Sequence, residues 1–475
     1  MSLGQLLFLN IMSSLPSTLQ PTLYEAYSLR NLQNSDHDDP NSNRSQRSPV
    51  PARPERPYQT LLLLSGFFMI FHVIGINSLF GIFQELYTSP NSSISDAKQR
   101  DALVSLVGTI GSGLTWSGSI FVNPMIARTE NLKLITITGV VIMSLGLILA
   151  SFSTKLWHLY LTQALLYGVG SSMYYFPIMS ITPLYFDKHR GFAMGVILAG
   201  SGIGGLVLAP VLQVLLDKYG IHWALRIIGL WNLLIGIPVA SVVKHRPGFN
   251  IGSRTRMNMS LVKRGTFLYQ AGGALLQAAG NIIPMYYLTS YSVSVLSYSR
   301  STGSLLLALN SGVNSIARVV MGILADQVGR QNTMIGSVLL SGLSVLALWY
   351  DAPRARFISF VVLYGIYAGG YNALLPTTIT EIYGVENYTT VNGFIYFVRG
   401  MGSILGAPLA GVILGNYQRG GGGPGKLQGS ELGALKQKFN DVVVYDGVLL
   451  LSAALCVGYV RWLDARDRGR WSWKA

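Results

Sequence analysis

Apolar residues run along this chain in long blocks that are separated by short polar segments. A helix that crosses a membrane needs about 20 predominantly apolar residues, because the hydrocarbon core is roughly 30 Å thick. Backbone polar groups find no water in lipid, so each block is expected to be helical. Blocks without Asp, Glu, Lys or Arg are 57–84, 102–127, 134–154, 156–186, 191–216, 227–243, 265–299, 331–350 and 357–380.

Three further blocks carry a single charged residue each. They are 302–325 with Arg318, 388–415 with Arg399, and 442–460 with Asp446. Glycine is abundant, with 53 residues, which is typical of membrane helices that pack closely together. The pattern therefore predicts an all-α membrane protein with twelve transmembrane helices.

Similar segments recur in the chain at an offset of almost 200 residues. The sequence at 165–169 resembles that at 362–366, and the glycines and proline of 202–210 recur at 400–408. This repeat indicates two pseudo-symmetric halves of six helices, and parallel halves place a substrate site at their interface near the membrane midplane. The expected divisions are a disordered cytosolic tail (1–57), an N-terminal half (58–243), a basic cytosolic linker (244–264), a C-terminal half (265–463) and a short cytosolic tail (464–475).

The composition agrees with a membrane protein. Half of the residues are hydrophobic and only 12% are charged, whereas a soluble domain carries roughly 25% charged residues. A net charge of +15 would indicate a nucleic-acid partner in a soluble protein, but here the basic residues lie between apolar blocks. We therefore expect contact with the lipid bilayer and no nucleic acid. The lone cysteine, Cys456, allows no intrachain disulfide and no cysteine-based metal site.

The Lys and Arg residues predict the orientation. With the N-terminus in the cytosol, 21 basic residues fall on the cytosolic side and 12 on the other. This bias places both termini inside. The apolar stretch 3–15 has no basic residue before it, as a secretory signal would require, so we interpret it as part of the tail. The sequon at Asn91 is then external, where a glycan can be added.

The chain contains motifs that carry a family resemblance. Residues 322–330 read G-I-L-A-D-Q-V-G-R and match the loop signature of the major facilitator superfamily. Residues 185–204, beginning Y-F-D-K-H-R-G-F-A-M-G, resemble the signature of monocarboxylate transporters. Arg318 falls where that family keeps an arginine in its eighth membrane helix, which is the block 302–325 here. Over about 58–465 the chain resembles the fungal branch of that family. The resemblance implies the major facilitator fold, transport by alternating access, and the plasma membrane as the family's default location.

The resemblance also implies gating residues. The loop signature supplies Gly322, Asp326, Gly329 and Arg330, and the expected role is a tight glycine turn with an ion pair that holds one gate state. The second signature adds Lys188 and Arg190.

Two groups that help couple protons to substrate in this family are absent. Asn314 stands where the family often has an aspartate, four residues before the arginine of the eighth membrane helix. The first predicted helix, 57–84, contains no lysine. Proton coupling and facilitated diffusion therefore both stay open.

The strongest candidate for substrate binding is Arg318. A guanidinium in a membrane helix is rarely kept without a partner or an aqueous cavity, and it matches a carboxylate bidentately. Arg399 follows the same logic, although it could instead lie at a membrane rim, and Arg318 could pair with helix carbonyls. His72 could carry a proton, but a neutral histidine bonded to a neighbouring carbonyl is the stronger interpretation. Further candidates, which could equally serve helix packing, are Asn77, Asn314, Asn372, Tyr286 and Tyr371.

The function that we expect is transport of a small organic molecule, in particular a monocarboxylate or related organic anion. The alternative is export of a fungal secondary metabolite. A non-transporting nutrient sensor is disfavoured because it would need a long cytosolic signalling domain. The G-x-G-x-x-G at 200–205 lies inside an apolar helix, so it does not indicate a dinucleotide site, and no P-loop, zinc motif or nucleophile elbow occurs. We therefore expect no enzyme activity, cofactor or metal.

Overall fold

The computed structural model describes residues 56–89, 92, 94–98, 100–129, 131–185, 190–244, 263–415 and 430–469. Within these ranges the regular structure is helical and contains no β-strand. The all-α prediction is thereby confirmed. The predicted N-terminal tail and most of the basic linker lie outside the described ranges.

The helices of the first half are separated by short breaks. Ser78 and Phe80 flank a break after the first helix. Pro124 lies within the later helix Ser119–Arg128 and does not end it. In chain order the elements are α3 (Arg56–Ser78), α4 (Phe80–Thr88), the 3₁₀ turn η1 (Ser95–Ala97), α5 (Asp101–Ser117), α6 (Ser119–Arg128), α7 (Leu132–Ala150), α8 (Leu156–Leu159), the π-helix η2 (Tyr160–Leu166), α9 (Tyr167–Tyr185) and α10 (Arg190–Ser241).

The second half has longer elements. They are α12 (Gly265–Ser294), α13 (Arg300–Val328), α14 (Arg330–Ser344), the π-helix η3 (Val345–Trp349), α15 (Arg354–Leu414) and α16 (Ser430–Asp467). Two of the long helices, α10 and α15, are each broken by a glycine with positive φ, at Gly220 and Gly384. Glycine tolerates this conformation without steric cost. Each long helix therefore consists of two helical segments that meet at a kink, at Gly220 in α10 and at Gly384 in α15.

Among the described residues, nine helices are long and apolar enough to cross a membrane by length and composition. About half of each apolar window is buried against other helices. The remainder is exposed, and it includes large apolar side chains such as Leu234, Ile316 and Leu455, each at least 70% exposed. Such a surface is suited to lipid, not water. The number of twelve membrane passes stays a prediction.

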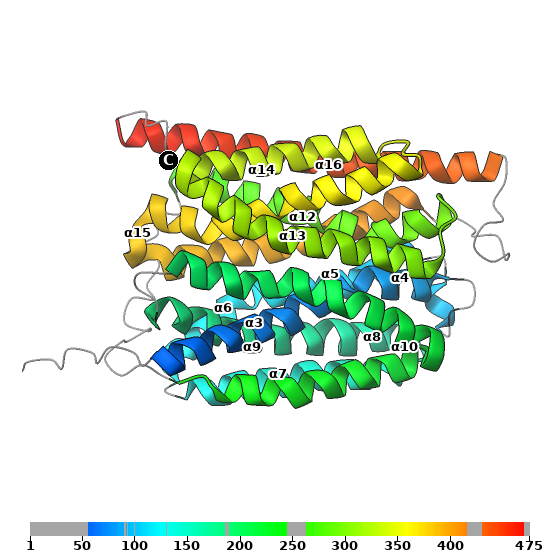
Figure 1. Cartoon of the computed structure of the whole chain (residues 1–475), viewed down its shortest axis with the longest axis horizontal. Helices are drawn as coiled ribbons and strands as arrows, with labels where there is room; N and C mark the ends of the chain where they lie inside the picture. The colour runs from blue at the N-terminus through cyan, green and yellow to red at the C-terminus, as the bar shows by residue number, and fades with distance from the viewer. Residues whose placement is uncertain are drawn as a thin grey trace, which may run out of the picture. The chain divides into compact units, whose positions relative to one another are not determined.

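Within the unit that begins at Pro54, the helices run side by side in one bundle (Figure 1). The two halves meet mainly along two helix pairs: α10 packs against α13, and α5 packs against α15. We call these contacts the α10–α13 seam and the α5–α15 seam. A glycine lies at the closest approach of each seam. A Cβ at Gly202 would clash with the Ser311 backbone, and one at Gly400 would lie 2.5 Å from the Gly113 carbonyl oxygen.

Candidate functional site

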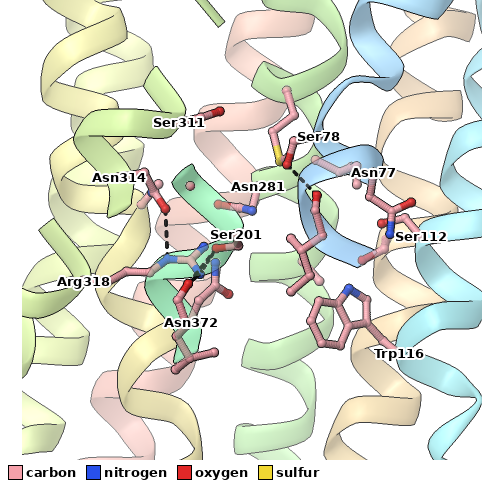
Figure 2. Close-up of a pocket in the computed structure, with 18 of the residues that line it drawn as sticks. Asn77, Ser78, Ser112, Trp116, Ser201, Asn281, Ser311, Asn314, Arg318 and Asn372 are labelled. Atoms are coloured by element: carbon pink, nitrogen blue, oxygen red, sulfur yellow. Dashed lines mark hydrogen bonds between the residues drawn. The ribbon is translucent and has the colours of Figure 1, made fainter. Parts of the chain in front are cut away.

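A cavity of about 100 Å³ lies between the two halves, and we call it the central cavity (Figure 2). Its walls come from α3, α5, α9 and α10 of the first half and from α12, α13 and α15 of the second. Among the described residues, the lining is rich in amides and hydroxyls and includes no Asp, Glu, Lys or His. Its polar residues other than tyrosine and tryptophan are Asn77, Ser78, Ser112, Ser201, Asn281, Asn310, Ser311, Asn314, Arg318, Asn372, Arg399 and Ser403.

Arg318 projects from α13 into the central cavity and is held by hydrogen bonds (Figure 2). Its Nε donates to Asn314 Oδ1 at 3.0 Å. Its Nη1 donates to the Leu198 carbonyl at 3.2 Å and to Ser201 Oγ at 2.5 Å, and both acceptors belong to α10. Arg318 therefore binds across the α10–α13 seam, and hydrogen bonds take the place of an acid partner.

Arg399 projects from α15 toward the other seam and is held mainly by aromatic rings. Its guanidinium carbon lies 5.5 Å from the ring centroid of Trp116, 5.7 Å from that of Tyr371 and 5.8 Å from that of Tyr396. We call these three rings the aromatic cage. Nη2 donates to Asn372 Oδ1, whereas the buried Nε has no hydrogen-bond partner among the described residues. Since cation–π contacts occupy the faces of a guanidinium, its N–H edge stays available.

The central cavity therefore carries two uncompensated positive charges. Neither guanidinium has a carboxylate within 4 Å in the described part of the chain, and the two charges act on each other. Burying a charge without a counter-charge is costly, because the interior does not replace the water that it removes. An anion that entered the cavity would supply the missing charge.

The asparagines on α13 organise this arrangement. Asn314 accepts from Arg318 and donates from Nδ2 to the Gly365 carbonyl at 3.1 Å, and Asn310 donates to the Val361 carbonyl at 2.8 Å. Both amides thus join α13 to α15 within the second half. On the opposite wall, Asn77 lies 3.5 Å from Thr115 Oγ1.

Of the predicted binding residues, the structure brings Asn77, Asn314, Arg318, Asn372 and Arg399 together in one cavity. Three others lie outside its lining, although Tyr371 belongs to the aromatic cage. His72 is fully buried, and its Nδ1 lies 2.7 Å from the Phe68 carbonyl oxygen of its own helix. Tyr286 packs edge-to-face on Phe80, with ring centroids 5.1 Å apart.

The predicted gating loop lies where α13 meets α14. Gly329 has a φ of 106° and separates the two helices, as expected for a tight glycine turn. Gly322 lies within α13 with open space around its Cα. Among the described residues, no ion pair joins Asp326 to Arg330. Lys188, the side chain of Arg190, and Asn91 lie outside the residues that the structure describes.

Sequence reasoning missed several cavity residues. Trp116 and Tyr396 face Arg399, and Ser201 accepts from Arg318. Each lies within an apolar block, where a lone aromatic or serine looks like ordinary helix packing. The signal that could have found Trp116 is its position on α5 one turn after Ser112, which also lines the cavity.

The chain matches the family model described as Major Facilitator Superfamily, over residues 60–406 and 266–470. It is 27% identical to "MFS-type transporter pynF" of Aspergillus niger over 74% of this chain and 81% of that protein. It is 28% identical to "Agnestins efflux protein AgnL12" of Paecilomyces divaricatus, over 75% of this chain and 81% of the relative. The predicted superfamily resemblance is thereby confirmed.

Two further comparisons bear on the family branch and the fold. "Monocarboxylate transporter 12-B" of Danio rerio is 27% identical over 61% of this chain and 69% of its own length, which agrees with the predicted monocarboxylate-transporter likeness. A crystal structure of a bacterial homolog to the human lysosomal transporter Spinster, inward-facing and unoccupied, superposes with a TM-score of 0.67. It is 17% identical and covers 88% of this chain and 100% of its own, so it supports the fold alone.

Proposed function

Since this chain belongs to the major facilitator superfamily, whose members are membrane transporters, we propose that its substrate is a small organic anion, moved across the membrane by alternating access. The observation that carries this proposal is the pair of uncompensated guanidiniums, Arg318 and Arg399, in a cavity between the two halves. A guanidinium presents parallel N–H donors that match a carboxylate, so a bound carboxylate would meet both charge and hydrogen-bonding demand.

The aromatic cage extends the proposal to the shape of the substrate. Trp116 and Tyr396 line the cavity as well as facing Arg399, so an aromatic or extended apolar body would pack beside the bound acid group. The cavity volume of about 100 Å³ is below the roughly 300–1,000 Å³ of sites that hold drug-sized ligands. A larger substrate therefore requires the two halves to move apart.

The second candidate function is export of a fungal secondary metabolite. The name of the Paecilomyces divaricatus relative favours it, because that protein is called an efflux protein for agnestins. Export and organic-anion transport are compatible, since they concern direction and chemistry respectively. We place the protein in the plasma membrane with both termini in the cytosol, which accessibility of terminal tags in intact and permeabilised cells would test.

Flux into proteoliposomes tests the proposal. The panel is lactate, pyruvate, a larger aromatic acid and a neutral flavin-like compound, supplied to wild type, Arg318→Ala and Arg399→Ala. We expect carboxylates to move in wild type and to move more slowly in both variants. Transport of the neutral compound alone would overturn the anion proposal. Normal flux of acids in both variants would overturn the role of the two guanidiniums in binding.

A matched control is available in Arg226→Ala. Arg226 also donates a hydrogen bond, to Ser151 Oγ at 3.0 Å, and also lies over aromatic rings, those of Phe152 and Trp223. It lies outside the lining of the central cavity. Its removal should leave carboxylate flux unchanged, which would show that the losses come from the cavity and not from the loss of any partly buried arginine.

A further inference from the structure

A carboxyl group lies buried behind the wall of the central cavity, on Asp446 of α16. Its side chain is 0% exposed, and neither carboxyl oxygen has a hydrogen-bond partner among the described residues. The residues that precede and follow it in the helix, from 442 to 460, contain no other charged side chain. Such a group is costly to keep in a membrane helix, and an intramembrane acid is a candidate functional site by default.

Among the residues that the structure describes, none pairs with the Asp446 carboxylate as a counter-charge. Its Oδ1 lies against Gly280 of α12, where a Cβ would be only 3.1 Å away. Helices α12, α14, α15 and η3 pack against α16; α12 and η3 contain no charged residue, and α14 contains only Arg330, at its first position. The charged residues of α15 are Arg354, Arg356, Glu381, Glu386 and Arg399, and no ion pair joins Asp446 to a described side chain of this helix. The titratable groups that it faces are the hydroxyls of Tyr364, on α15, and Tyr445, on α16 itself.

A short path connects this group with the central cavity. Gly280, which touches Asp446, is followed by Asn281, and Asn281 lines the cavity (Figure 2). Tyr364 lines the cavity too, and its hydroxyl lies 3.5 Å from Asn281 Oδ1. The Tyr364 hydroxyl and the Asn281 amide are thus polar groups of the cavity wall, and Asn281 directly follows the glycine that contacts the buried carboxyl.

We propose that Asp446 is a proton-binding site that exchanges its proton with the central cavity past Tyr364 and Asn281. An ionised carboxylate without a partner is strongly disfavoured in a low-dielectric interior, so the group holds a proton in this conformation. On release, the O–H bond breaks and the proton passes to cavity water, leaving a carboxylate. On uptake, cavity water returns a proton and the charge is neutralised. The role as a coupling site for transport rests on the proposed function above; the proton site itself does not.

This site would replace the missing family group. Asn314 cannot exchange a proton where the family often has an aspartate, and no acid is among the described residues that line the central cavity. Asp446 supplies a carboxyl on a different helix, α16, next to Gly280 of α12.

Infrared spectroscopy of the purified full-length protein in lipid tests the proton site without a substrate. We expect wild type to show, at neutral pH, the carbonyl stretching band of a protonated carboxylic acid. Asp446→Asn should lose this band, and Asp446→Glu should shift it. Asp441→Asn is the matched control, because Asp441 is an exposed acid on the same helix, and its spectrum should keep the band.

Transfer to D₂O then tests the exchange path. The band should move to lower frequency in wild type as the proton is replaced by deuterium, and Tyr364→Phe should slow this replacement several-fold. Absence of a protonated band at neutral pH in wild type would overturn the proton site. A band that does not respond to D₂O, or that responds equally fast in Tyr364→Phe, would overturn the path. Because no transported compound is involved, these results stand apart from the flux panel, whose failure would remove only the coupling role.

Discussion

The two seams between the halves each carry one arginine, and they hold it in different ways. At the α10–α13 seam, Arg318 donates three hydrogen bonds, two of them across the seam. At the α5–α15 seam, Arg399 lies among ring faces, one of them Trp116 across the seam, and donates one hydrogen bond. Of the five N–H groups of a guanidinium, Arg399 therefore keeps more for a ligand.

This difference indicates a division of labour. Hydrogen bonds to the opposite half must break when the halves separate, so Arg318 is suited to stabilise one conformation. Stacking on rings positions Arg399 without using its donors, so it is suited to bind the anion. Sequence alone favoured Arg318, because a family motif marks it. The following changes test this assignment, from the largest expected effect to the smallest.

Arg399→Ala should cause the largest loss of transport. Removing hydrogen bonds to a charged ligand costs about 1.5–3 kcal/mol, so kcat/KM for a carboxylate should fall about 10- to 100-fold. Arg399→Lys should fall between wild type and Arg399→Ala, since it keeps the charge but loses the planar edge. Concentration-dependent initial flux in proteoliposomes measures this. A smaller loss in Arg399→Ala than in Arg318→Ala would reverse the assignment.

Arg318→Ala should reduce the maximal rate and the thermal stability more than it raises KM. The change removes the bonds to Leu198 and Ser201, each contributing on the order of 1 kcal/mol to the conformation seen here. Flux kinetics and a thermal unfolding scan measure the two effects. Ser201→Ala is the companion variant, because it removes one cross-seam acceptor and keeps the charge. A pure KM effect in Arg318→Ala would instead place this residue in substrate binding.

Asn314→Asp should weaken anion transport at neutral pH. A carboxylate beside Arg318 Nε, now 3.0 Å from the amide oxygen, would neutralise one of the two positive charges. The loss should shrink as pH falls, because protonation of the new acid restores the original charge. We expect an effect of about tenfold or less, measured as KM for the transported acid at two pH values. No change of KM with this variant would show that the charge of Arg318 does not reach the substrate.

Loss of the ion pair between Glu85 and Arg300 should have a small effect. Glu85 of α4 lies 3.1 Å from Arg300 at the start of α13, so the pair joins the two halves outside both seams. Arg300 is 40% exposed, and pairs of this kind contribute about 0–1 kcal/mol. Glu85→Gln should therefore change flux less than twofold and respond to salt. A loss comparable to that of Arg318→Ala would make this pair a principal lock.

The smallest effect is expected from the pair of Asp351 and Lys436, which lies within the second half. The hydrogen bond and charge of Lys436, 2.5 Å away, lower the pKa of Asp351 below its ordinary 3.8. A carboxyl whose pKa is lower in the folded than in the unfolded protein stabilises the fold at pH values above the unfolded-state pKa. This stabilisation is lost as the pH falls through the lowered, folded-state pKa. Asp351→Asn should abolish this slight acid dependence of the unfolding temperature. An unchanged dependence would assign it to other acids.

The sequence was most informative where lipid imposes a rule. Charge-free blocks can only be helices in a membrane, and the recurrence of 202–210 at 400–408 gave the symmetry of the two halves. Because a buried charge is costly in a membrane, the sequence also indicated Arg318 and Arg399 as candidates for substrate binding. It could not rank them, because their difference depends on Trp116, Tyr371 and Tyr396, which come from separate segments.

The remaining site residues were beyond sequence reasoning for a related reason. His72 and Asn77 lie on the same predicted helix. The rotation of that helix about its axis directs Asn77 into the cavity and His72 toward Trp231, and this rotation could not be predicted from the sequence. Asp446 was visible as a charge in an apolar block, but nothing in the pattern showed that it touches Gly280 behind the cavity wall.

Gly202 and Gly400, one repeat apart in the chain, put bare backbone against backbone at the two seams. Side chains that interlock must change rotamer before two helices can shift, which adds a barrier to each movement. The helix surfaces at Gly202 and Gly400 carry no side chain that must change rotamer, so the helices can tilt against each other there with a lower barrier. Because the two glycines occupy equivalent positions of the repeat, the two seams have matching pivots. A bulkier residue at Gly400, which is not among the residues that line the central cavity, should slow the transport cycle without contacting the substrate.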